Sequence, residues 1–186
     1  MKQQFKIQNR MFSFSNTDID FATVADIAAI KDLLNSAYRG EESKKGWTTE
    51  ADLIAGDTRT DEATITHVML QSGSVFLIYK EEQQKIIGCV NLQQHDAKLY
   101  LGMFSVSPPL QGRGIGKQIL LAVEEYAHHL QKKAIYMSVI SLRTELINWY
   151  IRHGYADTGE RKPFVEDDIT GKHLRSLEFM IMEKTL

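Results

Sequence analysis

The spacing of apolar residues in the first half of the chain predicts a strand, helices and then further strands. Residues 20–23 form a short stretch of strand length, and apolar residues between 27 and 37 recur at steps of three and four, as in a helix with one buried face. That helix begins at Thr23 or Asp26 and ends near residue 38, where Gly40 serves as its C-cap. A short helix over 50–55 and another from 61 or 62 to about 71 follow. Apolar runs at 75–80 and 85–94 then predict a hairpin.

The second half of the chain alternates strands with helices. Residues 99–106 form an apolar run that Pro108 and Pro109 end, because proline cannot donate to a strand ladder. Helical spacing over 115–130, an apolar run at 133–140 and a helix from Ser141 or Thr144 to about 153 come next. Residues 155–159 and 174–183 predict two last strands joined by a loop at 160–172. We therefore predict a single domain over 19–186, with residues 1–18 as an N-terminal arm or an extra strand.

The composition is that of an ordinary globular protein. The chain has 186 residues, of which 43% are apolar and 25% charged, and a net charge of −2 gives no general attraction for nucleic acid or anionic lipid. It has no run approaching the roughly 18 apolar residues of a membrane span, and its first residues lack the apolar core of a signal peptide. We expect a cytoplasmic protein without nucleic-acid or membrane partners. Cys89 lies between apolar neighbours and is interpreted as a packed core thiol.

A glycine-rich turn stands between the strand ending at residue 106 and the helix after it. Its sequence, Q-G-R-G-I-G-K over 111–117, brings adaptable backbone to a helix start, where free N–H groups favour a bound phosphate. A P-loop needs glycine at 111 and serine or threonine at 118, and both positions hold glutamine. A dinucleotide loop needs G-x-G-x-x-G, whereas these glycines are spaced G-x-G-x-G. The pattern that remains is Q-x-x-G-x-G.

This Q-x-x-G-x-G loop resembles the pyrophosphate loop of the GNAT superfamily of N-acetyltransferases. A second landmark of that superfamily, a helix ending in Tyr-x-x-x-Gly-Phe/Tyr, is matched by Tyr150, Gly154 and Tyr155. The resemblance covers about residues 19–183 and is strongest over 99–130. It implies the GNAT acyltransferase fold, an α/β (α+β) domain with a mixed, curved central sheet and helices on both faces. It also implies acetyl-CoA as co-substrate.

The resemblance further implies where the cofactor lies. The sheet of this fold opens between 99–106 and 133–140, and the pantetheine arm is expected to pair there with backbone groups of Phe104, Ser105 and Val106. The pyrophosphate is expected on the backbone N–H groups of Gln111, Gly112, Arg113, Gly114, Ile115, Gly116 and Lys117. The Arg113 and Lys117 side chains either add charge there or are simply solvated. No metal is expected, because His128 and His129 have no carboxylate or cysteine partner at metal-ligand spacing.

Tyr150 is the expected general acid. In similar enzymes this tyrosine protonates the departing thiolate, and a phenol with a pKa of about 10 is protonated at neutral pH. The alternative is that its ring only packs the helix on the sheet. Members of the superfamily commonly carry asparagine seven residues earlier, where this chain has Arg143. We do not transfer the asparagine's role to Arg143, whose guanidinium could instead pair with Glu145 or Glu166 or contact a carboxylate or phosphate.

The general base is less clearly indicated. Glu50, Glu145 and His95 are candidates, and a chain of water to bulk solvent would serve equally well. Trp47 and Glu50 could together hold the acceptor's ammonium by π-contact and charge, or they could belong to a helix cap with a packed tryptophan.

The acceptor pocket is expected from the segments 38–59 and 160–172, as in similar proteins. Arg39 or Arg59 could bind a substrate carboxylate, and Pro163 with Phe164 could form an apolar wall.

These patterns predict an N-acetyltransferase that moves the acetyl group of acetyl-CoA to a primary amine of a small molecule, amino acid or peptide. Transfer is expected to be direct, in a ternary complex. Two alternatives stay open: a non-catalytic acyl-CoA-binding sensor or subunit, and an acyltransferase that uses another acyl-CoA. The acceptor and the oligomeric state, with a homodimer as one option, are not decided by the sequence.

Overall fold

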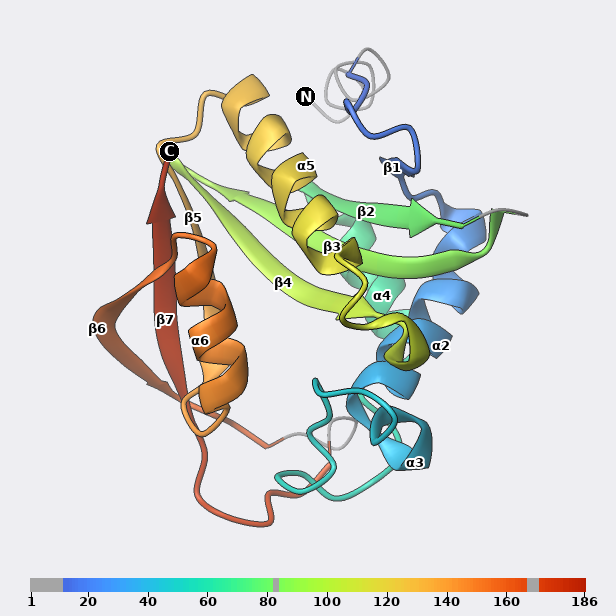
Figure 1. Cartoon of the computed structure of the whole chain (residues 1–186), viewed down its shortest axis with the longest axis vertical. Coiled ribbons are helices and arrows are strands. Elements are labelled where there is room, and N and C mark those ends of the chain that lie inside the picture. Colours follow the sequence, from blue (N-terminus) through green and yellow to red (C-terminus); the bar gives the residue numbers. More distant parts are fainter. Residues whose placement is uncertain (1–11, 82–83, 167–170) are drawn as a thin grey trace.

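The structure, a computed structural model, describes residues 12–81, 84–166 and 171–186. These residues form a seven-stranded sheet in the order β1-β2-β3-β4-β5-β7-β6 (Figure 1). The strands are β1 (Ile19–Phe21), β2 (Ser74–Lys80), β3 (Ile86–His95), β4 (Lys98–Val106), β5 (Ala134–Ile140), β6 (Ala156–Pro163) and β7 (Glu178–Thr185). Neighbouring strands are antiparallel, apart from the parallel pair β4 and β5. The predicted mixed sheet is confirmed.

The helices agree with the predicted periodicity in most places. They are α2 (Ile27–Tyr38), α3 (Gly40–Ser43), α4 (Glu62–Leu70), α5 (Ile115–His129) and α6 (Thr144–Arg152), with short 3-10 turns at Val24–Asp26 and Pro108–Leu110. Thr23 and Asp26 form a capping box before α2, and Asp61 caps α4 by accepting from the backbone N–H of Thr64. Gly40 follows the end of α2 with φ of +69°, as expected of a glycine C-cap.

The β2 strand shows how helices cover both faces of the sheet. Successive side chains of a strand point to opposite faces. Val75 and Leu77 accordingly pack in the cluster that contains α5, whereas Phe76 and Ile78 pack in the cluster formed with α2 and α4. Both faces of β2 are therefore buried, which explains its unbroken apolar run. The predicted arrangement of helices on both faces is confirmed (Figure 1).

The sheet opens where β4 and β5 separate. Their parallel pairing runs only from Lys98, opposite Ala134, to Tyr100, opposite Tyr136. Further along, Met103 and Phe104 of β4 together face one residue of β3, since Cys89 pairs with Ser105 and Asn91 with Gly102. Such a bulge bends its strand, and Met103 has φ of +47°, which is uncommon for a residue with a side chain. The bulge therefore coincides with the part of β4 that turns away from β5.

Two stretches differ from the predictions. No helix forms over 50–55; residues 51–53 are turns, and Ile54 makes an isolated bridge with His173 because this segment is tied to the chain before β7. The last two strands are also displaced: β6 extends four residues beyond the predicted 155–159, and β7 begins four residues after the predicted start at 174. Every residue of β6 is exposed, so its sequence, A-D-T-G-E-R-K-P, carries no apolar alternation from which its length could be predicted.

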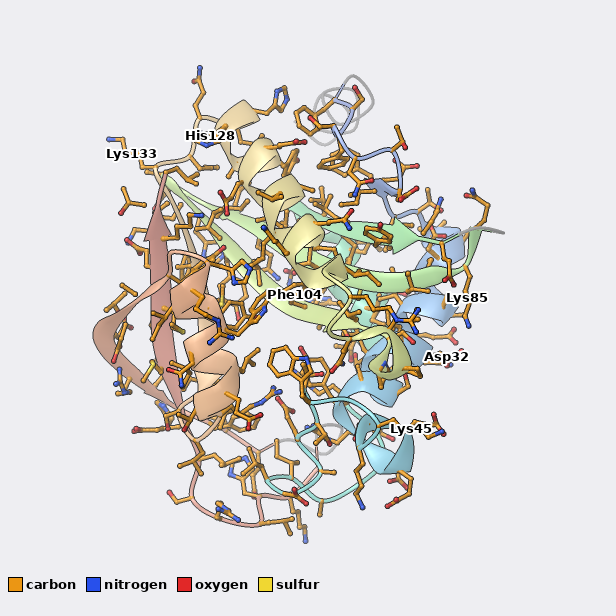
Figure 2. The ribbon with its side chains drawn as sticks, in the orientation of Figure 1. Asp32, Lys45, Lys85, Phe104, His128 and Lys133 are labelled. Carbon is orange, nitrogen blue, oxygen red and sulfur yellow. The ribbon has the colours of Figure 1, made fainter. Side chains whose placement is uncertain are left out.

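The part of the predicted N-terminal arm that is described packs on the domain. Phe14 is buried against the α5 side of the core and Phe12 lies half-buried beside it, whereas residues 1–11 lie outside the described residues. Charged side chains such as Lys45 and Lys85 lie at the periphery, and Phe104 points into the interior between α5 and α6 (Figure 2). Within the described ranges, no helix is long and apolar enough to cross a membrane.

Candidate active site

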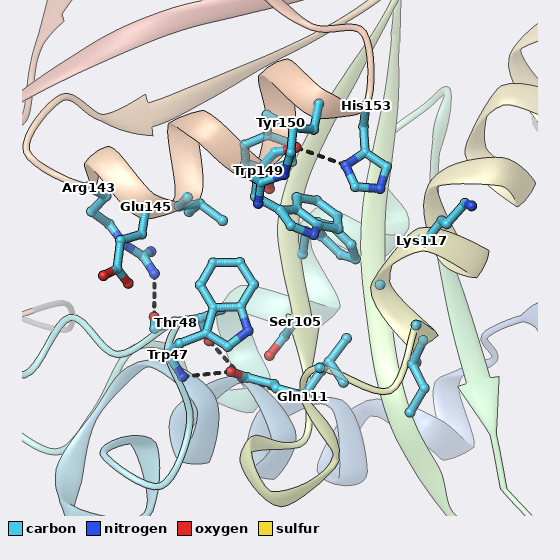
Figure 3. Close-up of a pocket in the computed structure, with 18 of the residues that line it drawn as sticks. Trp47, Thr48, Ser105, Gln111, Lys117, Arg143, Glu145, Trp149, Tyr150 and His153 are labelled. Atoms are coloured by element: carbon cyan, nitrogen blue, oxygen red, sulfur yellow. Dashed lines mark hydrogen bonds between the residues drawn. The ribbon is translucent and has the colours of Figure 1, made fainter.

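A cavity of about 710 Å³ lies where the sheet opens. It is bounded by the end of β4, the glycine-rich turn, the start of α5 and one side of α6 (Figure 3). Of the residues expected to contact the cofactor, those that line it are Phe104, Ser105, Val106, Gln111, Gly112, Gly114, Ile115, Gly116 and Lys117. Arg113 does not line it. The two cationic side chains of the turn therefore differ, since Lys117 lines the cavity and Arg113 does not.

The glycines of the turn leave room for an anion at the start of α5. Gly112 and Gly114 have φ of +82° and +85°, and a Cβ added at either would meet nothing within 4 Å. Gly114 is the N-cap of α5, so it has no side chain with which to cap the first N–H groups of the helix. A helix start with free N–H groups beside an open cavity suits a phosphate group.

The side chain of Gln111 makes hydrogen bonds to distant residues that the sequence did not indicate. Its Oε1 accepts a hydrogen bond of 2.9 Å from the backbone N–H of Trp47, and its Nε2 donates to Thr48 Oγ1 at 2.8 Å and to the Val106 carbonyl at 3.0 Å. Gln111 thus ties the segment at 47–48 to the end of β4 (Figure 3). The contact joins residues more than sixty positions apart, so only the tertiary structure reveals it.

Aromatic rings form one wall of the large cavity. The rings of Trp47 and Trp149 are tilted with respect to each other, with centroids 6.2 Å apart, and the Trp149 ring lies beside that of His153, also tilted, at 4.1 Å (Figure 3). Trp149 packs against the hydrophobic core, partly buried, and also lines the cavity. Trp47 is 38% exposed, so its ring is only partly covered in this structure. This wall offers apolar and π surface to a ligand that follows the opening in the sheet.

Tyr150 stands between the large cavity and a second, smaller one. It is 4% exposed, lines both cavities and makes no hydrogen bond to any described residue through its hydroxyl. Burial raises its pKa well above the usual 10.0, and the nearby Arg143 guanidinium partly opposes that increase. The phenol is therefore protonated at neutral pH, with a free donor at the junction of the cavities.

The smaller cavity, about 100 Å³, is lined by both segments from which the acceptor pocket was expected. Tyr38, Glu50 and Arg59 come from the first segment and Phe164 from the second. Residues that line both cavities are Tyr38, Phe104, Arg143, Leu146 and Tyr150. The Tyr38 hydroxyl donates to the carbonyl of Phe104 in the β4 bulge, and burial raises the pKa of that hydroxyl to about 12.

Glu50 is held between two arginines. Its Oε2 lies 2.5 Å from Arg39 Nη1 and its Oε1 lies 3.1 Å from Arg143 Nη1, with side-chain exposures of 0% for Arg39, 9% for Glu50 and 8% for Arg143. Arg143 also donates to the Thr48 carbonyl, so it joins the start of α6 to the segment after α3. Arg143 thus pairs with Glu50 and not with Glu145 or Glu166. The pairing spans 93 positions, which explains why no local pattern indicated it.

The other residues that the sequence suggested for acceptor binding or for the general base do not lie in one cavity. Trp47 lines the large cavity and Glu50 the small one, so the two side chains face different cavities. Glu145 lines the large cavity, whereas His95 lines neither and pairs with Tyr136. Over the described ranges, no group of three potential metal ligands comes together.

Comparison with known proteins identifies the family. The sequence model of the acetyltransferase (GNAT) family matches residues 27–155, well over half of the chain. The ribosomal-protein-S18-alanine N-acetyltransferase of Escherichia coli has a similar structure, with 13% identity, a TM-score of 0.67, and coverage of 90% of this chain and 92% of that one. The structure of yncA from Salmonella typhimurium with its cofactor acetyl-CoA has 22% identity, a TM-score of 0.65, and coverage of 92% and 95%. No curated protein matches the sequence.

The chain therefore belongs to the GNAT acetyltransferase family and is an enzyme of the acyltransferase class. The solved structures, at these identities, establish the shared fold and not the acceptor.

Proposed function

We propose that the protein transfers the acetyl group of acetyl-CoA directly to a primary amine while both substrates are bound. The observation that carries this proposal is the meeting of two cavities at Tyr150, one beside an anion-binding helix start and one lined by the acceptor segments. Holding an amine and an acyl donor side by side removes most of the entropic cost of their encounter. The acceptor classes are a small molecule, an amino acid or a peptide amine.

The groups that line the large cavity suit the chemistry of coenzyme A. The turn at 111–117 offers backbone N–H groups to a pyrophosphate, and Lys117 lines the same cavity and adds a positive charge. Ser105 has a buried hydroxyl without a partner among the described residues, which is a free hydrogen-bonding group beside the path of a pantetheine arm. Bound acetyl-CoA would supply the activated acyl group. The backbone around Phe104, Ser105 and Val106 would align it.

The side chains have separate roles in this proposal. Tyr150 donates a proton to the departing thiolate, since its phenol is protonated and reaches both cavities. Glu50 is a positioning residue, because each of its oxygens already accepts a hydrogen bond from a guanidinium. No other carboxylate and no histidine among the described residues lines the small cavity. The amine therefore loses its proton to water.

The absence of a protein base from this scheme makes the pH dependence predictable. We expect kcat/KM for the acceptor to rise about tenfold per pH unit up to the pKa of the acceptor's own amine. No decrease is expected below about pH 10, because burial holds the pKa of Tyr150 above 10.0 and the donor stays protonated. Measuring the profile with two acceptors of different amine pKa checks this, since the midpoint should follow the acceptor. A midpoint common to both acceptors would instead identify a base on the enzyme.

Gly114→Glu tests the cofactor site. The new carboxylate would enter the open space at the start of α5 and repel a phosphate, so we expect coenzyme A affinity to fall by about 30-fold or more, measured by calorimetry. Gly159→Glu is the matched control, because Gly159 also has positive φ, at +82°, and open space around its Cβ position, but lies on the exposed strand β6. Equal affinity in wild type and Gly114→Glu would contradict the proposed cofactor site.

Turnover of an amine panel separates the proposed reaction from its alternatives. Release of free thiol from acetyl-CoA, dependent on added amine, is the expected result. Retention of coenzyme A without turnover of any amine would favour a sensor or subunit. Faster turnover with succinyl- or propionyl-CoA than with acetyl-CoA would assign another acyl donor.

A further inference from the structure

Arg59 lines the small cavity with a charge that no described residue neutralises. Its backbone N–H donates to Asn35 Oδ1 at 2.7 Å, which fixes this part of the chain against α2. Its guanidinium lies over the ring of Tyr38, 5.7 Å from the centroid, and forms no ion pair or hydrogen bond with any described residue. The backbone of Arg59 is thus anchored while its cationic end stays available at the cavity.

The other charged groups of the small cavity do not supply the missing anion. Among the described residues that line it, the one carboxylate is Glu50, and both oxygens of Glu50 are engaged by Arg39 and Arg143. The described part of the lining therefore carries more positive than negative charge. Arg143 also lies beside Tyr38, 5.9 Å from its ring centroid, so the excess charge is concentrated around this tyrosine. Such a site attracts an anionic group and disfavours an acceptor whose only charges are positive.

The rest of the lining limits the size and character of the acceptor. Phe164 and Phe179 stack with centroids 4.6 Å apart and form an apolar wall, to which Met137 adds. The cavity holds only about 100 Å³, which suits a small molecule better than a folded protein surface. An acceptor that fits has one anionic group, a short apolar part and an amine that reaches the junction at Tyr150.

We propose that Arg59 binds the carboxylate of the acceptor, and that the acceptor is a small amino acid carrying an apolar side chain. This inference rests on the proposed acetyl transfer, because it takes the small cavity as the acceptor site. A guanidinium matches a carboxylate with two parallel N–H···O bonds, which fixes orientation as well as charge. With the carboxylate held at Arg59, the amine is directed away from it, toward Tyr150. The reaction forms an amide bond and releases coenzyme A as the free thiol.

The test compares amino acids with their carboxamides. Free methionine and phenylalanine are assayed against methioninamide and phenylalaninamide with wild type, Arg59→Gln and Arg59→Lys. We expect the free acids to be preferred by wild type and their KM to rise roughly 10- to 100-fold in Arg59→Gln, with little change in kcat. The KM of the amides should stay the same, and Arg59→Lys should recover part of the loss. Arg175→Gln, at an exposed arginine that lines neither cavity, is the matched control.

A binding measurement separates failure of this inference from failure of the proposed function. Calorimetry of methionine against the enzyme saturated with coenzyme A needs no turnover. Binding that weakens in Arg59→Gln, without turnover of any amine, would support the carboxylate site and contradict acetyl transfer. Turnover in which acids and amides are used equally, or are affected equally by Arg59→Gln, would contradict the carboxylate site alone.

Discussion

Replacing Tyr150 with phenylalanine is expected to lower kcat by about 100- to 10,000-fold, the usual contribution of a general acid or base. The substitution removes only the hydroxyl, which makes no hydrogen bond to any described residue, so packing of the ring against Phe104 and Tyr155 should persist. Affinity for coenzyme A should change little, because the proposed pyrophosphate site is at the start of α5, away from the Tyr150 hydroxyl. Single-turnover rates, combined with calorimetry of coenzyme A binding, measure the two quantities separately.

Tyr155→Phe is a closely matched control for this substitution. The Tyr155 ring lies 5.7 Å from that of Tyr150, and its hydroxyl is also buried without a partner among the described residues, but Tyr155 lines neither cavity. Removal of the Tyr155 hydroxyl should leave kcat unchanged. A small loss in Tyr150→Phe, or equal losses in the two variants, would show that the Tyr150 hydroxyl does not protonate the leaving group.

Glu50→Gln is expected to reduce the free energy of unfolding by about 3 kcal/mol, because it removes the buried negative charge that pairs with both the Arg39 and the Arg143 guanidinium. Urea denaturation measures this loss. Because Arg143 links the start of α6 to the segment at 48–50, the acceptor's KM should rise as well. The slope of kcat/KM against pH should be retained, since a positioning residue does not remove the proton from the amine.

Glu42→Gln provides the control for the loss of an ion pair. Glu42 pairs with Lys45 at 2.6 Å on the same stretch of chain, but both side chains are largely exposed, so the change should cost well under about 1 kcal/mol. If Glu50→Gln proved as stable as Glu42→Gln while its pH profile flattened, Glu50 would be a base and not a positioning residue.

Several features could be predicted from the sequence because their signals are local. The strand, glycine turn and helix over 99–130 appear in order in a single stretch, and each is indicated by apolar spacing or by backbone chemistry. Tyr150 was expected from the resemblance to the superfamily, because Tyr150, Gly154 and Tyr155 match its landmark Tyr-x-x-x-Gly-Phe/Tyr. The short turns at 51–53 and the exposed strand β6 were not predicted correctly, because their conformations depend on distant segments or leave no apolar pattern.

By itself, the sequence determined the family, the order of most helices and strands, and the residues of the glycine-rich turn before α5. Only the tertiary structure decided how those parts face one another. It brought Glu50 between Arg39 and Arg143, tied Gln111 to Trp47, and placed Arg59 over Tyr38 at the small cavity without an ion pair to any described residue. The physical reason is the range of the interactions. Periodicity and turn chemistry act over a few residues, whereas buried charges and cavity walls are assembled from segments up to about a hundred positions apart.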